Sequence, residues 1–308
     1  MQSYPGPGRD TCLLVMEKNR TNPGRGYYHV CSDGNFASVI FHNPEDFKAA
    51  MNRVAVITLR LRVVILAFVL MDNHFHFIIL APDEDAAYRF ANEFKRLTGL
   101  YLTTKYHQPN SLRKLPVKVL PIPDEEALKT QICYVLKNPT KARIGMFYDY
   151  PWGTGTLYFR SSRQPGPARR ADSFTDEAVR MICQTRITIP GDWLIRDGIL
   201  IPDNYVPVEE VEQLFRTTRS FMYFLSLNKD DEIEQDMGQW NELRLTDSEL
   251  RQERDLYAQE NYGVSRLRDL SLPDRIRVAR YLRHKFLCSR KQLARIVQLP
   301  LETLEKAL

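Results

Sequence analysis

Two histidines flank a phenylalanine in the segment Asn73-His74-Phe75-His76-Phe77. Side chains two positions apart on a strand point to the same face, so His74 and His76 would converge while the phenylalanines pack behind them. Two neighbouring imidazoles can bind a metal ion together. The same short pattern is also typical of surface histidines on a half-buried strand, and on the residues alone both interpretations stay open.

A tyrosine and an asparagine four residues apart, Tyr134 and Asn138, lie in a segment whose pattern predicts a helix. Residues at this spacing share one helix face. A tyrosine hydroxyl can act as a nucleophile, and an amide oxygen is a hard ligand that suits Mg²⁺ or Mn²⁺. Taken singly, each also has a purely structural explanation, as a packed aromatic side chain and as a helix C-terminal residue before a proline.

The elements that must position these residues alternate between strand and helix patterns. The order β-α-β-β-α-β-α predicts an α+β fold, a ferredoxin-like antiparallel sheet backed by helices. The predicted strands are 26–32, 61–70, 75–80 and 117–121, and the predicted helices are one opened by Asn43-Pro44, then 84–106 and 125–136, the last stopping at Asn138-Pro139.

The second half of the chain is nearly all helical in pattern. Its predicted helices cover residues 176–188, 208–227, 248–259 and 273–287, and the last 20 residues suggest a helix-turn-helix. Ser289 and Gln292 have the spacing of a capping box at the start of one of these helices. A stretch rich in Pro, Gly, Ser and Arg predicts a basic linker at 161–172, which separates a domain at 11–160 from a helical domain at 173–308 with the helix-turn-helix at about 273–308.

Four segments resemble, in the right order, the motifs of the HUH single-tyrosine transposases, above all the REP-associated tyrosine transposases and their insertion-sequence relatives. They are 27–35, 66–80 with the two histidines, 132–142 with Tyr134 and Asn138, and 148–152 with Tyr-Pro-Trp. The resemblance covers roughly residues 11–160. The chain departs from the family pattern at Asp72, where proline is common, and at Asp33, where arginine is usual.

The resemblance implies a transposase-like DNA endonuclease and strand transferase. His74 and His76 would bind a divalent metal, Mg²⁺ or Mn²⁺, with Asn138 as third ligand, and Tyr134 would be the nucleophile. It would cleave and rejoin single-stranded, hairpin-flanked DNA through a 5′-phosphotyrosine intermediate, in transposition, without a nucleotide cofactor. In dimeric relatives the tyrosine helix can be exchanged between subunits, so a homodimer with the site in cis or in trans stays open.

Two other functions are compatible with parts of this pattern. A domesticated or inactive relative would keep the fold and act as a DNA-binding regulator. A zinc hydrolase built on His74 and His76 would need further ligands. The remaining histidines show no motif that matches the pair, namely His29, His42, His107 and His284.

The charge pattern favours an anionic polymer as partner. The net charge is +5, with +6 over residues 1–160, +2 over 161–172, −10 over 173–260 and +7 over 261–308. Basic side chains interleaved with Tyr101 and Tyr106 suit phosphate contacts and base stacking, although a solvated helix face explains them too. The candidate DNA contacts are Lys95, Arg96, Lys105, Arg113, Lys114 and Lys118, and in the last helices Arg290, Lys291 and Arg295.

Composition excludes several classes of protein. The longest apolar run, 63–71, is far shorter than the ~20 residues of a membrane-spanning helix. The first residues lack the basic start and apolar stretch of a secretory signal, and the five cysteines are scattered, which predicts reduced thiols. We therefore expect a soluble cytoplasmic protein with no membrane partner.

Overall fold

A computed structural model of the chain describes residues 26–34, 39–107, 111–160, 167–227, 230, 233, 245, 247–264, 266–286, 288 and 290–307. The chain divides into two compact units, Met1–Leu227 and Asn228–Leu308. This boundary differs from the predicted division at residues 161–172, because residues 167–227 belong to the first unit. No helix in the described part combines the length and the apolar character needed to cross a bilayer.

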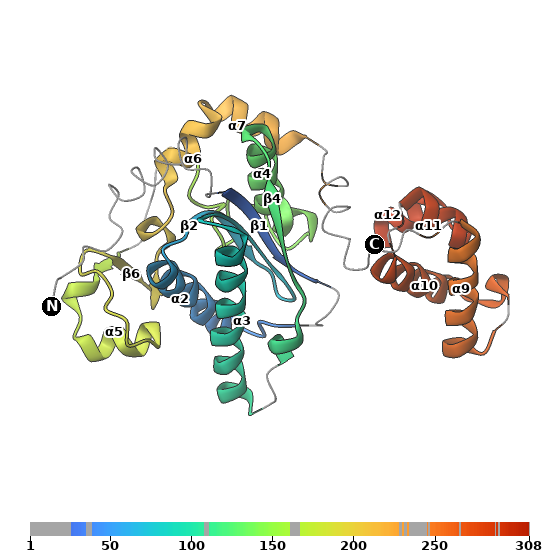
Figure 1. The fold of residues 1–308 in the computed structure, drawn as a ribbon, viewed down its shortest axis with the longest axis horizontal. Coiled ribbons are helices and arrows are strands. Elements are labelled where there is room, and N and C mark those ends of the chain that lie inside the picture. Colours follow the sequence, from blue (N-terminus) through green and yellow to red (C-terminus); the bar gives the residue numbers. More distant parts are fainter. Residues whose placement is uncertain are drawn as a thin grey trace. The chain divides into compact units, whose positions relative to one another are not determined.

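The first unit is built on a four-stranded antiparallel sheet with the strand order β2-β3-β1-β4 (Figure 1). The strands are β1 (Gly26–Ser32), β2 (Val64–Leu70), β3 (Phe75–Ala81) and β4 (Val117–Ile122). Together with α2 (Pro44–Leu61) and α3 (Glu84–Tyr106), they follow the order β-α-β-β-α-β of a ferredoxin-like unit. The predicted antiparallel α+β fold is confirmed for this half of the chain.

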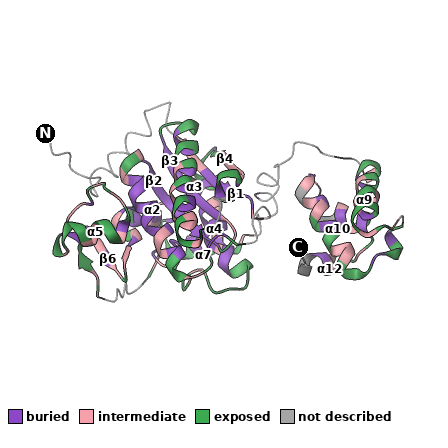
Figure 2. Cartoon of the chain, turned by 90° about the horizontal axis from the view of Figure 1, so that it is seen from below, coloured by how far each residue is buried: buried purple, intermediate pink, exposed green. Residues whose placement is uncertain are grey.

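Helices cover both faces of this sheet. Phe75 and Phe77 of β3 pack edge-on against Phe90 and Phe94 of α3, and α2 packs beside α3. Residues of β3 at alternate positions face α4 (Glu125–Lys141), which contacts β2 and β3. Figure 2 shows that buried residues make up most of the strands and part of the helices that cover them.

Helix α4 runs through the Asn138-Pro139 pair, where the sequence predicted its end. Proline has no N–H to donate to the carbonyl four residues earlier, which here is that of Val135. The Asn138 amide supplies the missing donor, because its Nδ2 lies 3.2 Å from the Val135 oxygen and 3.0 Å from that of Tyr134. The helix therefore continues for one more turn.

Residues 150–158 cover the outer edge of β2, which has no neighbouring strand on that side. Leu70 donates its backbone N–H to the Trp152 carbonyl at 2.8 Å, and Phe68 donates to Thr154 Oγ1 at 3.0 Å. A Cβ on Gly153 would lie 2.6 Å from the Phe68 carbonyl oxygen, so only glycine permits this approach. The segment thus satisfies edge groups that would otherwise be open to pairing with another chain.

Residues 167–227 are not nearly all helical as predicted. They form a small antiparallel sheet and three helices: β5 (Arg169–Arg170), β6 (Leu194–Arg196), β7 (Ile199–Leu200), α5 (Asp176–Cys183), α6 (Val208–Phe215) and α7 (Thr218–Ser226). The predicted helix 208–227 is broken at Arg216, which has φ 62°, and Thr217 caps α7 by accepting from the Ser220 N–H. Short 3₁₀ helices lie at Ser111–Lys114, Ala171–Ser173, Pro202–Asn204 and, in the second unit, Leu267–Asp269.

The second unit contains α9 (Asp247–Tyr262), α10 (Leu272–Lys285), α11 (Arg290–Val297) and α12 (Leu301–Ala307). The bounds of these helices are close to the predicted ones. The helices share an apolar core that includes Leu250, Val278, Leu282, Leu293, Ile296 and Leu304. Ser289 of the predicted capping box lies outside the described residues. A DNA-binding helix-turn-helix at this end of the chain stays a prediction.

Candidate active site

The two histidines of the motif lie at the start of β3. His74 precedes the strand, and His76 is its second residue. Their ring centroids are 5.0 Å apart and the ring planes are nearly perpendicular. The structure therefore brings the two imidazoles together as their spacing predicts.

Helix α4 presents Tyr134 and Asn138 to these histidines. The ring centroid of Tyr134 lies 5.7 Å from that of His76, and Asn138 is a side-chain neighbour of His74. Tyr134 is 4% exposed and Asn138 is 9% exposed. Lys141, seven residues after the tyrosine and on the same helix face, places Nζ 4.4 Å from the centre of its ring.

The residue before the first histidine fixes that imidazole. His74 Nδ1 lies 2.7 Å from Asn73 Oδ1, and Asn73 Nδ2 donates to the Gly34 carbonyl at 2.7 Å. The second bond assigns the oxygen of Asn73, so the first must be donated by His74 Nδ1–H. This leaves the lone pair of His74 on Nε2.

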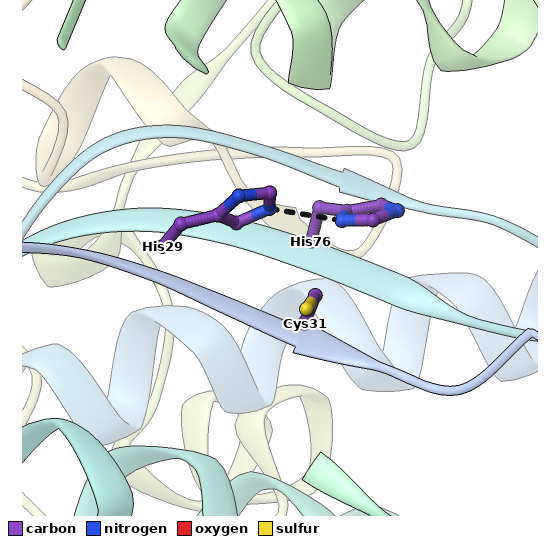
Figure 3. A group of neighbouring side chains, drawn as sticks. All are labelled: His29, Cys31 and His76. Carbon is purple, nitrogen blue, oxygen red and sulfur yellow. Dashed lines mark hydrogen bonds between the residues drawn. The ribbon is translucent and has the colours of Figure 1, made fainter. Parts of the chain in front are cut away.

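A third histidine, His29, belongs to this cluster, and the sequence analysis missed it. In the register of β1 and β3, Cys31 lies opposite His76, and His29 projects from the same face two residues earlier. His29 Nε2 lies 3.0 Å from His76 Nδ1 (Figure 3). Its position on strand 26–32 was the available signal, but the pairing register that places it beside His76 could not be read from the motifs.

Burial keeps all three imidazoles neutral. It lowers the pKa of His29 and of His74 to about 4. Burial also lowers the pKa of His76 well below its usual value, and the neighbouring His74, His29 and Lys141 lower it further. Neutral imidazole is the form that binds a metal ion, so near pH 7 no proton must be removed from these rings.

Two overlapping groups of side chains could hold a metal. His74, His76 and Asn138 offer two imidazoles and one amide oxygen, since the Asn138 amide nitrogen is bound to the helix backbone. The amide oxygen suits Mg²⁺ or Mn²⁺, whereas the two imidazoles suit a transition-metal ion.

The other group is His29, Cys31 and His76, whose ligand atoms lie within 4.8 Å of one another. Burial raises the pKa of Cys31 to about 12, so its thiol keeps its proton, and two of the nitrogens are bound to each other. As it stands, this second group is a hydrogen-bonded cluster rather than a ready set of ligands.

The two residues that depart from the family pattern both lie near His74. Asp33 is buried, whereas Asp72 is exposed and accepts backbone hydrogen bonds from Ile40 and Phe41 through its carbonyl. Both carboxylates favour the charged form of His74 and so oppose the fall in its pKa. Neither replaces any of His74, His76, Tyr134 or Asn138.

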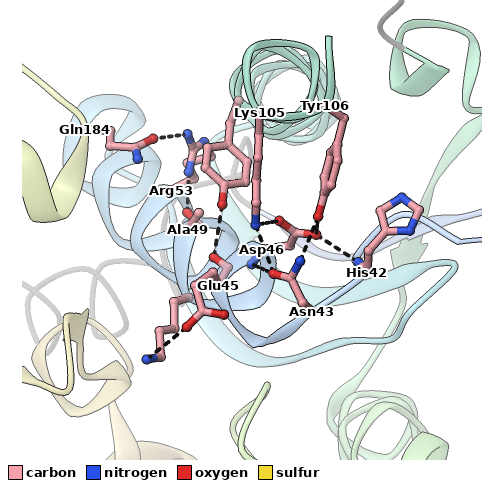
Figure 4. Close-up of polar contacts among 11 residues, drawn as sticks. His42, Asn43, Glu45, Asp46, Ala49, Arg53, Lys105, Tyr106 and Gln184 are labelled. Carbon is pink, nitrogen blue, oxygen red and sulfur yellow. Dashed lines mark hydrogen bonds and ion pairs between the residues drawn. The ribbon is translucent and has the colours of Figure 1, made fainter. Parts of the chain in front are cut away.

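The candidate DNA contacts fall into two groups. Lys105 binds Asp46 at 2.7 Å (Figure 4), Arg96 binds Glu93, Lys95 donates to the Leu115 carbonyl, and Arg295 binds Asp247. These four therefore have intramolecular partners. In the other group, Arg113 and Lys114 are exposed, and Lys118 lies on β4 opposite Cys31. Arg290 and Lys291 begin α11, and their side chains lie outside the described part of the structure.

Comparisons with known proteins yield one likeness. No family model and no curated protein matches the chain. One solved structure, described as the "Structure of the REP associates tyrosine transposase bound to a REP hairpin", is similar over 50% of this chain and 82% of its own length, with 15% identity and a TM-score of 0.34. A likeness of this size does not establish a family for the chain.

Proposed function

We propose that this protein is a metal-dependent DNA endonuclease and strand transferase that uses Tyr134 as its nucleophile. The observation that supports this most is the meeting of Tyr134 on α4 with His76 on β3, 5.7 Å apart between ring centroids. Asn138 lies beside His74, so a nucleophile stands next to a set of three metal ligands. All of these residues come from a single chain, and we therefore place the site in cis.

The chemistry follows from these groups. The Tyr134 oxygen attacks the phosphorus of a DNA phosphodiester and loses its proton to solvent, while the bond from phosphorus to O3′ breaks and O3′ takes up a proton. The products are a 5′-phosphotyrosine and a 3′-hydroxyl, and attack by a 3′-hydroxyl reverses the step. A divalent cation held by His74, His76 and Asn138 supplies charge neutralisation at the phosphate. Lys141, whose Nζ lies 4.4 Å from the centre of the Tyr134 ring, would add a second positive charge near the nucleophile.

The position of Tyr134 favours single-stranded DNA as the substrate. Only 4% of Tyr134 is exposed, so a phosphate can reach it only on a strand that adapts to the protein surface, which a rigid duplex cannot do. A single strand can bend in this way, and the sequence resemblance suggests a flanking hairpin as the feature recognised. We assign Arg113 and Lys114, both exposed, to backbone phosphate contacts.

Covalent capture tests the proposal. The full chain is incubated with labelled single-stranded DNA that carries a hairpin, with Mg²⁺ or Mn²⁺, and is separated on a denaturing gel. We expect a slowly migrating protein–DNA adduct that is lost in Tyr134→Phe and kept in Tyr148→Phe, an exposed tyrosine of the same unit. DNA binding without any adduct from the parent protein would instead identify a DNA-binding regulator.

A further inference from the structure

We propose that His29 is a positioning residue that keeps the proton of His76 on Nδ1 and so leaves the Nε2 lone pair for the cation. The proposal rests on the metal site described above. Its basis is the 3.0 Å contact between His29 Nε2 and His76 Nδ1, which joins two buried side chains on neighbouring strands. In Figure 3 the second nitrogen of His76 lies on the side of the ring that faces away from His29.

The direction of this hydrogen bond decides which tautomer His76 adopts. Two neutral imidazoles share a single proton, so either His76 donates through Nδ1–H or His29 donates through Nε2–H. If His29 donated, the proton of His76 would sit on Nε2, and His76 could not act as a ligand through that atom. The other side of the His29 ring distinguishes the two cases.

The neighbour to consider at Nδ1 of His29 is Gln131 of α4. Among the described residues, His29 Nδ1 and Gln131 Oε1 are both buried without a partner at hydrogen-bonding geometry. Gln131 is nevertheless the hydrogen-bonding neighbour that opposes the fall in the pKa of His29. If His76 donates to His29, the remaining His29 proton is on Nδ1, and it becomes the donor that the Gln131 oxygen lacks. The opposite direction leaves both atoms as acceptors, which is costly in a buried site.

The same arrangement holds the other histidine of the motif. Asn73 accepts a hydrogen bond from His74 Nδ1, and His29 accepts one from His76 Nδ1. Both rings therefore present Nε2. Hydrogen bonding at the far nitrogen of a metal-binding histidine fixes its tautomer and orientation, and loss of such a partner typically lowers metal affinity 10- to 100-fold.

Nitrogen NMR of the metal-free full-length protein tests the tautomer directly. We expect His76 to carry its proton on Nδ1 in the parent protein, and to lose this preference in His29→Phe, which keeps a ring but has no acceptor. We also expect the affinity for Mn²⁺, measured by calorimetry, to fall about 10- to 100-fold in His29→Phe. His29→Gln, which restores an acceptor oxygen, should recover most of this loss.

Val30→Ala is the matched control, because Val30 is equally buried on the same strand but its side chain points to the opposite face of the sheet. It should leave both the tautomer and Mn²⁺ affinity unchanged. A proton on Nε2 of His76 in the parent protein would overturn the proposal, as would unchanged Mn²⁺ binding in a folded His29→Phe. Should that variant not fold, the tautomer of the parent and the affinity of His29→Gln still decide the matter. Absence of a DNA adduct with the Nδ1 tautomer intact would count against the proposed function and not against His29.

Discussion

The chemistry proposed for this chain depends on hydrogen bonds that orient individual side chains. Asn73 and His29 each occupy one nitrogen of a motif histidine, and the backbone of α4 occupies the amide nitrogen of Asn138. The nitrogen and oxygen atoms left for a metal ion come from two segments, the start of β3 and α4. The site is therefore preorganised by partners that do not themselves bind the ion.

Asn138 has two roles that mutation can separate. Asn138→Ala should weaken Mn²⁺ binding and should also lower the free energy of unfolding by roughly 1–3 kcal/mol, because the Val135 carbonyl loses its donor. Adding Pro139→Ala returns a backbone N–H to that carbonyl. Urea unfolding of the double variant should recover part of the stability, while calorimetry should still show weak Mn²⁺ binding. Recovery of both properties together would contradict the assignment of Asn138 as a ligand.

Residue types and spacing were sufficient to find most of the candidate site. His74 and His76 follow from strand alternation, and Tyr134 and Asn138 follow from helical spacing. His29 was missed because its role depends on which residue of the neighbouring strand it faces. Lys95, Arg96 and Lys105 were proposed as DNA contacts from charge alone, which cannot reveal the partners that bind them in the fold.

At the scale of elements, the sheet holds the histidines and α4 carries the tyrosine across its face. The order of strands and helices could be predicted because apolar residues closely follow the alternating pattern of strands and the roughly 3.6-residue period of helices. The course of α4 through Pro139 could not, since it depends on a side chain that replaces a backbone donor. The break between α6 and α7 was missed because it rests on one residue with positive φ and on the cap at Thr217.

Thr154 should be required at the edge of β2. Its hydroxyl is fully buried and accepts the Phe68 N–H at 3.0 Å. Thr154→Val keeps the shape but leaves this N–H without an acceptor, which should cost about 1–3 kcal/mol in urea unfolding. Thr154→Ser keeps the hydroxyl and should cost less. Equal losses in the two variants would show that packing, not the hydrogen bond, holds the segment.

The contact between the start of α2 and the end of α3 should be pH-dependent (Figure 4). Burial alone would raise the pKa of Asp46, but hydrogen bonds from Lys105, Tyr106 and the His42 N–H outweigh it and lower that pKa below 3.8. A carboxylate with a lowered pKa contributes stability that is complete above its unfolded value and is lost as the pH falls through the folded value.

Asp46→Asn should therefore reduce the free energy of unfolding most at neutral pH. The difference from the parent protein should shrink below about pH 4, where the unfolded carboxyl takes up its proton. Urea unfolding at several pH values measures this. A difference that grows on acidification would contradict the ion pair with Lys105.

At the scale of the whole molecule, the main finding is that residues 167–227 complete the first unit. Asn52 of α2 donates to the carbonyls of Ile182 and Gly198 and accepts the Leu200 N–H. Phe159 packs against Phe221 at 4.8 Å between ring centroids. The linker-like composition of 161–172 concealed this, because an exposed connection can join parts of one unit as well as two units.

Truncation tests the boundary. A chain that ends at residue 227 should unfold cooperatively and keep the stability of the first unit. A chain that ends at residue 160 lacks the three backbone groups that hydrogen-bond with the Asn52 side chain. It also exposes apolar surface at Phe159, so it should be much less stable. Circular dichroism during urea unfolding compares the two. Equal stability would favour the boundary predicted from composition.

Mass spectrometry of the trapped protein–DNA adduct tests the central claim most directly. After reaction of the full chain with hairpin-bearing single-stranded DNA and Mn²⁺, the adduct is digested and the residue that carries the nucleotide is identified. The account predicts a phosphotyrosine at Tyr134, formed in the parent protein and absent when both His74 and His76 are replaced by alanine. Attachment at another residue, or an adduct that forms equally well without the two histidines, would contradict it.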